Sequence, residues 1–196
     1  MCEKVTNLQK QPNLPNPQGK GLVPVLESLA ESRSLVSVVP KHIEQISSEL
    51  FTSLFILHSK FQFKPVVGKH YWLYQCDQNF KLSLISPQEW GRSAFGLFVG
   101  ECVLQKDITW TLTLDSDAAN NQVLMTYIES KRREFEDALV SADSIDTVLP
   151  FYLDGLPFYQ RVFASALANS LKQSMVMSGI QGLNYTQAQK CLSANN

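Results

Sequence analysis

Residues 40–61 read PKHIEQISSELFTSLFILHSKF, and this stretch decides the fold of the chain. Its apolar residues recur at spacings of three and four, which places them on one face of a helix. That face consists of Ile43, Ile46, Leu50, Leu54, Leu57 and Phe61. Pro40 suits the first turn of this helix. Phe51, Phe55 and Ile56 widen the apolar face, so we expect the helix to be covered on two sides or to meet a partner.

After Gly68 the apolar period changes from about 3.6 to two, which is typical of strands. The pattern predicts strands at 70–75, 80–85, 97–105 and 108–114. In the last of these, Thr109, Thr111 and Thr113 alternate with large apolar residues and are expected to face water. The predicted fold class is therefore α+β, with the long helix packed on a small four-stranded antiparallel β-meander.

A short helical turn is predicted between the second and third strands. Ser86 suits the N-cap, Pro87 the first helical position, and Glu89 can return a hydrogen bond to the cap. Gly91 then ends the turn. This capping chemistry accounts for the turn as a structural element.

Two further helices are predicted at 122–140 and 157–177, and together they form an appended helical C-terminal segment. The polar run 115–121 resembles a linker. We therefore divide the chain into three parts. They are an extended or disordered arm at 1–24, rich in Pro and Gly, a helix-and-meander domain at 25–115, and a helical extension at 116–196.

Four ordered blocks of sequence resemble one uncharacterised protein family. They are GKHYWLY at 68–74, LISPQEWG at 84–91, FVG at 98–100 and LQKDITWT at 104–111. The signature of that family is a YLY strand, an ISPxEWG turn, an FLG strand and an LxxDxSW end. The likeness covers about residues 16–114 and implies no activity. It implies that eight residues belong to the signature: Tyr71, Tyr74, Ser86, Pro87, Glu89, Trp90, Gly91 and Trp110. We interpret five of them as structural: Tyr71, Ser86, Pro87, Glu89 and Gly91.

Composition and charge narrow the class of protein. The chain has 196 residues, 44% of them hydrophobic, with 17 basic against 18 acidic side chains. The formal net charge is therefore −1, and the chain lacks the net positive charge that is typical of nucleic-acid-binding proteins. The most membrane-like stretch, 162–177, is too short and polar to cross a bilayer. The four cysteines form no C-x-x-C pair and the chain opens on polar residues, so we expect a cytoplasmic protein.

The sequence predicts no catalytic or metal site and no cofactor. The run 91–96 misses the spacing of a nucleophile elbow by one residue, and no glycine-rich loop lies between a strand and a helix. His58, His70, Cys76 and Cys102 lack the paired spacing of zinc ligands.

The remaining functional signal is aromatic, since exposed Trp, Tyr and Arg dominate recognition surfaces. The candidate binding residues are Trp72, Tyr74, Trp90, Arg92 and Trp110. We therefore expect a non-enzymatic interaction or scaffolding module that holds a protein or peptide. The alternative is a small-molecule-binding domain or hydrolase-like enzyme, with His70, Ser86 and Glu89 in a pocket between the meander and the C-terminal helices. A homodimer is a second way to cover the wide helix face, next to cover by the C-terminal segment.

Overall fold

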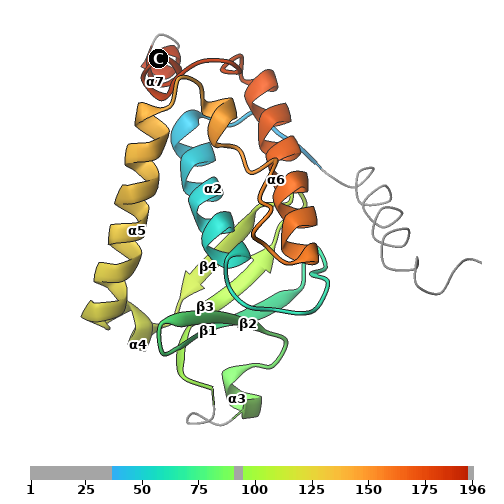
Figure 1. The fold of residues 1–196 in the computed structure, drawn as a ribbon, viewed down its shortest axis with the longest axis vertical. Coiled ribbons are helices and arrows are strands. Elements are labelled where there is room, and N and C mark those ends of the chain that lie inside the picture. The colour runs from blue at the N-terminus through green and yellow to red at the C-terminus, as the bar shows by residue number, and fades with distance from the viewer. Residues whose placement is uncertain (1–36, 91–94, 194–196) are drawn as a thin grey trace, which may run out of the picture. The chain divides into compact units, whose positions relative to one another are not determined.

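The computed structural model describes residues 37–90 and 95–193. The arm predicted at 1–24 lies outside the described residues. From Ser37 onward the described residues belong to one compact unit. Figure 1 shows its helices and its single four-stranded sheet, which confirm the α+β class. In chain order the elements are α2 (Ile43–Leu57), β1 (His70–Cys76), β2 (Asn79–Ser83), α3 (Pro87–Trp90), β3 (Leu97–Leu104), β4 (Trp110–Leu114), α4 (Ser116–Ala119), α5 (Gln122–Ser141), the 3-10 helix η1 (Ile145–Val148), α6 (Phe158–Met177) and α7 (Tyr185–Ser193).

Helix α2 is shorter than predicted at both ends. It begins at Ile43, after His42, whose Nδ1 accepts a hydrogen bond from the Gln45 N–H at 3.3 Å. Pro40 therefore precedes the helix and is not in its first turn. At the other end, the Lys60 N–H donates to the Phe80 carbonyl at 2.8 Å, and the Lys60 carbonyl accepts from Leu82 at 3.1 Å. The chain leaves the helix here because it pairs with β2.

The sheet is antiparallel throughout, but its strand order is β2-β1-β3-β4. The predicted meander, in which β2 would neighbour β3, is therefore wrong in order. Strand β1 lies between β2 and β3, so the connection from β2 to β3, residues 84–96, has to pass β1. Crossing two strand spacings needs only about 10 Å, which a connection of this length spans easily. Alternating hydrophobicity identifies strands but does not say which strands are neighbours.

The main core lies between α2 and one face of the sheet. Tyr71 and Leu73 of β1 point into it, as does Trp110 of β4, and all three are almost fully buried. The Tyr71 and Trp110 rings meet edge to face at 5.6 Å. The Trp110 backbone N–H donates to Ser53 Oγ at 2.9 Å, which fixes β4 against α2.

A smaller aromatic cluster occupies the opposite face of the sheet. Tyr74 packs on the rings of Phe95 and Phe98 at 5.6 and 5.5 Å, and its hydroxyl donates to the Ile85 carbonyl at 3.1 Å. The connection between β2 and β3 therefore covers this part of the sheet. Figure 1 shows α3 on the side of the sheet away from α2.

The C-terminal helices cover the remaining faces of α2. Helix α2 runs between α5 and α6 in Figure 1, and it also contacts α7. Apolar residues of these helices join the same core as the sheet. They are Leu124, Ile128, Leu139, Phe163, Leu167, Leu171, Met175 and Ala188. The wide apolar face of α2 is thus covered within the chain, and a homodimer is not needed for that purpose.

Close approach of two strands explains the glycine of the FVG block. Between β1 and β3 the register shifts, because Leu73 lies opposite Gly100 and Tyr74 opposite Phe98. On the other side of β3, a Cβ added at Gly100 would lie 2.2 Å from the Thr113 carbonyl oxygen of β4. The strands are therefore too close for any side chain at this position.

We predict that Gly100→Ala lowers the free energy of unfolding by about 1–3 kcal/mol or more, since overpacking against backbone cannot be relieved by a rotamer change. Chemical denaturation of the full chain measures the loss. Gly155→Ala is the matched control, because a Cβ there meets nothing within 4 Å. A Gly100→Ala chain as stable as the control would contradict the close approach of β3 and β4.

The shared core also bears on the boundary placed at 115. A chain ending at Asp115 would lose α5, α6 and α7 and expose the apolar residues of α2 that they cover. Each buried Leu, Ile or Phe contributes about 1.5–3 kcal/mol. We therefore expect this fragment to aggregate or to lose its helical circular dichroism, although the sequence boundary predicts an independently folded domain.

The control for the truncation is a chain ending at Ser193, which keeps every described helix. Sedimentation and thermal melts compare the two chains, and sedimentation of the full chain also tests the homodimer. A monomeric, cooperatively melting fragment ending at Asp115 would support the sequence boundary instead.

Candidate functional site

The turn between β3 and β4 holds the carboxylate of the LxxDxSW block. Asp107 Oδ1 accepts from the Thr109 N–H at 3.2 Å and from its hydroxyl at 2.7 Å. Ile108 has a φ of 66°, a region that β-branched residues rarely adopt. Two sequence expectations fail here. Ile108 belongs to the turn, and Thr109 is buried because it bonds to Asp107, so only Thr111 and Thr113 are exposed.

A buried ion network joins this turn to the start of α2. The Lys41 ammonium pairs with Asp107 and with Glu49, and the Lys41 side chain is only 3% exposed. The Gln45 amide donates to the other Glu49 oxygen at 2.9 Å. Residues distant in sequence are therefore tied together by one cation and two carboxylates.

The network shifts the pKa values of Asp107 and Lys41 in opposite directions. Burial would raise the pKa of Asp107, but hydrogen bonds from Lys41 and Thr109 and the charge of Lys41 outweigh it and hold this pKa below its usual range. Burial would lower the pKa of Lys41, but the hydrogen bonds and charges of Asp107 and Glu49 outweigh it and raise this pKa. Both groups are therefore charged near neutral pH.

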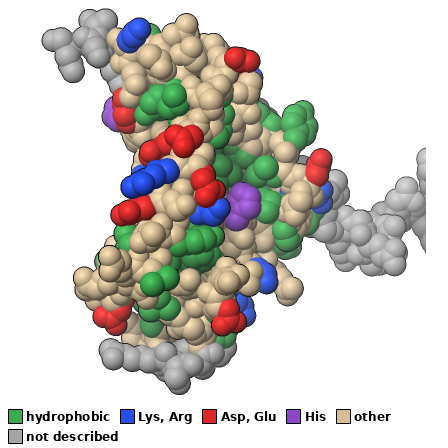
Figure 2. All heavy atoms as spheres, turned by 60° about the vertical axis from the view of Figure 1, so that its left-hand side comes forward, with side chains coloured by type: hydrophobic (Ala, Val, Ile, Leu, Met, Phe, Trp, Pro, Cys, Tyr) green, Lys and Arg blue, Asp and Glu red, His purple; other side chains and the backbone are tan. Residues whose placement is uncertain are grey.

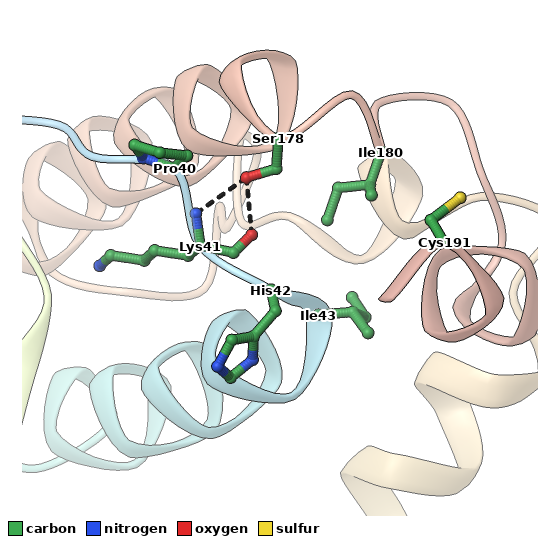
Figure 3. A pocket seen from close by; sticks show the side chains of 7 residues that line it. All are labelled: Pro40, Lys41, His42, Ile43, Ser178, Ile180 and Cys191. Atoms are coloured by element: carbon green, nitrogen blue, oxygen red, sulfur yellow. Dashed lines mark hydrogen bonds between the residues drawn. The ribbon is translucent and has the colours of Figure 1, made fainter. Parts of the chain in front are cut away.

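A shallow pocket of about 270 Å³ lies beside Lys41, between the start of α2 and the ends of α6 and α7. Figure 3 shows its seven lining residues. The Ser178 hydroxyl accepts from the Lys41 N–H at 2.8 Å and donates to the Lys41 carbonyl at 2.7 Å. The Lys41 side chain extends away from Ser178, and the His42 ring points away from Cys191 (Figure 3). The pocket therefore brings no nucleophile and base together.

The α3 turn is capped, though not as predicted. The Glu89 carboxylate accepts from the Ser86 N–H at 2.9 Å, as expected of a capping box. The Ser86 hydroxyl, however, donates to the same carboxylate at 2.9 Å and does not accept from the helix. These two bonds, the backbone one first, lower the pKa of Glu89.

The candidate binding residues do not form one exposed surface. Tyr74 and Trp110 are only 3% and 1% exposed, so we correct both to buried, structural positions. Trp72 is half-buried on the sheet face opposite the main core and stays a predicted contact residue. Arg92 and the Trp90 side chain lie outside the described residues, as does Gly91 of the family signature. Tyr71, also in that signature, is a core residue whose hydroxyl accepts from the Val66 N–H at 2.7 Å.

The three polar residues of the enzyme-like alternative do not converge on one site, because His70 lies on β1 and the other two lie at α3. His70 of β1 pairs with Glu101 of β3 on an exposed part of the sheet. Ser86 and Glu89 bond to each other at α3. None of these residues lines the pocket beside Lys41 or the second pocket, which lies between α2 and α5.

A second concave site is the groove between α2 and α5, closed at one end by α7. We call it the α2–α5 groove, and its volume is about 220 Å³. It is lined by Glu44, Ser47, Ser48, Phe51, Arg132, Phe135, Glu136 and Tyr185. Figure 2 turns the α5 side of the molecule toward the viewer and shows acidic and basic side chains gathered next to apolar ones.

The floor of the groove is aromatic and its rim is charged. The Phe51 and Phe135 rings lie 5.8 Å apart, and the Arg132 guanidinium lies 4.8 Å from the centre of the Phe51 ring. Burial raises the pKa of Tyr185, and the negative charges of Glu44 and Glu136 raise it further. Two carboxylates from different helices therefore act on the same end of the groove.

The sequence predicted neither the Lys41 ion network nor the α2–α5 groove, and the reason is the same for both. The apolar width of α2 and the charged face of 122–140 were visible, but no sequence signal showed that these faces meet. Lys41 and Glu49 resemble ordinary exposed residues in sequence. Asp107, in the family signature, was the one available clue to the ion network.

The described residues hold neither a metal cluster nor a membrane-spanning helix. Within 37–90 and 95–193, no three His, Cys, Asp or Glu side chains gather closely enough to hold a metal ion. Nor does any helix in those ranges combine the length and the apolar character needed to span a bilayer.

The Lys41 ion network is expected to contribute to the free energy of unfolding. We expect Lys41→Met to lower the free energy of unfolding by about 3–5 kcal/mol at neutral pH, because it leaves two poorly solvated carboxylates without their cation. Lys106→Met is the control, since Lys106 is exposed beside the same turn, and a change within about 0.5 kcal/mol is expected for it.

The pH dependence separates this charge effect from lost packing. The lowered pKa of Asp107 stabilises the fold above its unfolded value of about 3.9, and this contribution is lost as the pH falls through the folded pKa. The raised pKa of Lys41 stabilises the fold below about 10.4, and this contribution is lost as the pH rises through the folded pKa. Denaturation at several pH values should therefore show the largest wild-type advantage between these limits and a smaller one near pH 3. A pH-independent difference would reduce the role of Lys41 to packing.

Among known proteins, the chain resembles one family, for which no activity is described. No curated protein matches the chain, and no solved structure matches it. One family model matches, from residue 37 to residue 129 within α5. The resemblance seen in the sequence motifs covers about residues 16–114, so the matched range begins and ends later in the chain. Residues 37–129, somewhat under half of the chain, match the model of the family described as protein of unknown function (DUF2452), which confirms the expected resemblance to an uncharacterised family.

Proposed function

We propose that this chain is a non-enzymatic interaction module and that it holds a segment of another protein in the α2–α5 groove. The single observation that carries the proposal is the concave site of about 220 Å³ with an aromatic floor and a charged rim. Aromatic residues and arginine, which are part of this lining, are enriched at sites where proteins recognise one another.

The rigidity of the groove walls supports this function. Helix α2 is buried against the sheet, and α5 is anchored near both of its ends by Leu124, Ile128 and Leu139. Between these anchors, residues 129–138 of α5 are exposed apart from the half-buried Phe135. A segment bound between two such helices would meet a preformed surface, which lowers the entropy cost of binding.

Two further expectations belong to the same proposal. Trp72 offers a second contact surface on the open part of the sheet, beside His70 and Glu101. The cytoplasm is the proposed compartment, because Cys76, Cys102 and Cys191 are unpaired thiols and reduced cysteines are usual there.

Filling the groove tests the proposal. Ser48 is exposed on α2 and lines the groove, so Ser48→Trp places a bulky ring in it without disturbing the core. Ser130→Trp is the matched control, because Ser130 is exposed on α5 and does not line the groove. Both variants should melt within a few degrees of the wild-type chain.

The readout is quantitative mass spectrometry of proteins retained by the immobilised full chain. We expect at least one protein retained by the wild type and by Ser130→Trp to fall about tenfold or more with Ser48→Trp. Identical retention by all three chains would contradict the groove as the binding site.

A further inference from the structure

We infer that the segment bound in the α2–α5 groove presents a basic side chain, with its charge between Glu44 and Glu136 and its aliphatic stem on the aromatic floor. This inference rests on the proposed function and adds the chemistry of the partner. The charged and aromatic side chains that would contact this basic side chain come from α2, α5 and α7.

The charges of the lining residues favour a cation. Glu44 of α2 and Glu136 of α5 give two negative charges, against one positive charge from Arg132. Among the described residues, Glu44 has only long polar contacts, at 3.4 Å to His42 and 3.4 Å to Gln189. No ion pair of Glu136 is found in the same part of the chain. The pKa of Tyr185 is raised partly by both carboxylates, which places their fields at one end of the groove.

The aromatic floor suits the same occupant. Cations are attracted to the faces of aromatic rings, and the stems of Lys and Arg pack on apolar surface. The molecule already shows this contact, because the Arg132 guanidinium lies 4.8 Å from the centre of the Phe51 ring. Phe135 and Tyr185 are half-buried, so part of each ring is accessible to a bound side chain.

An acidic partner fits less well. Among the described residues, Arg132 is the one basic residue that lines the groove, and its guanidinium already lies over the Phe51 ring. A carboxylate in the groove would also face Glu44 and Glu136, and opposing like charges disfavour binding.

The test is an NMR titration of the isotope-labelled full chain with two small probes. N-acetyl-arginine amide carries the cation, and N-acetyl-citrulline amide is its neutral isostere. We expect the arginine probe to shift the backbone amide signals of α2 and α5 residues that line the groove, with weaker binding as salt rises from about 0.05 M to 0.5 M. The citrulline probe should bind several-fold more weakly.

Charge variants complete the design. The double variant Glu44→Gln with Glu136→Gln should weaken binding of the arginine probe about five- to tenfold, as expected for two exposed ion pairs. The matched control is Glu129→Gln with Asp137→Asn, which removes two exposed acidic side chains of α5 that do not line the groove. The control should leave binding unchanged.

The outcomes distinguish this inference from the proposed function. Equal binding of both probes, or binding that ignores the double variant, overturns the basic occupant. Absence of any groove shift with the arginine probe overturns it as well. The groove itself is judged by Ser48→Trp, so partner loss with Ser48→Trp but not with the charge variants would retain the docking site and reject the basic side chain.

Discussion

Helix α2 cannot be left in water on any large part of its surface, and this constraint organises the rest of the molecule. Its buried residues face the sheet on one side and the C-terminal helices on others. Burial of apolar side chains is the main driving force of folding, so an element apolar on several sides needs cover from several directions. Strand β4, α5, α6 and α7 supply that cover. Segments far apart in sequence therefore depend on one helix for their position.

Polar contacts fix how these segments sit on α2. The Trp110 backbone N–H donates to the Ser53 hydroxyl in the C-terminal half of the helix, and the Lys41 network holds the β3–β4 turn at the start of the helix. At the same end of α2, the hydroxyl of Ser174 in α6 donates to the Val39 carbonyl. The hydroxyl of Ser178, the C-cap of α6, donates to the Lys41 carbonyl. Hydrogen bonds are directional and the ion network is desolvated, so they add register to a hydrophobic attraction that has none.

The residues of the family signature divide between the two faces of the sheet. Tyr71 and Trp110 form an aromatic pair on the α2 side, and Asp107 anchors Lys41. Tyr74 is covered on the opposite side by the connection that contains the Ser86–Glu89 turn. These signature residues therefore all have packing or hydrogen-bonding partners within the fold. The groove lies elsewhere, where α5 passes α2 over a partly accessible aromatic floor.

The sequence determined the local elements. Period-3.6 and period-2 patterns identified α2, α5, α6 and the four strands, because each pattern reflects the burial of one face of one element. It did not determine the strand order, since β3 can pair with either β1 or β2 without changing any alternation. Nor did it reveal that Tyr74 and Trp110 are buried, that Lys41 meets Asp107, or that α5 and α2 form a groove. These contacts depend on which faces of distant segments meet in three dimensions. The periodic pattern of a segment shows which of its faces is buried, but not which other segment covers that face.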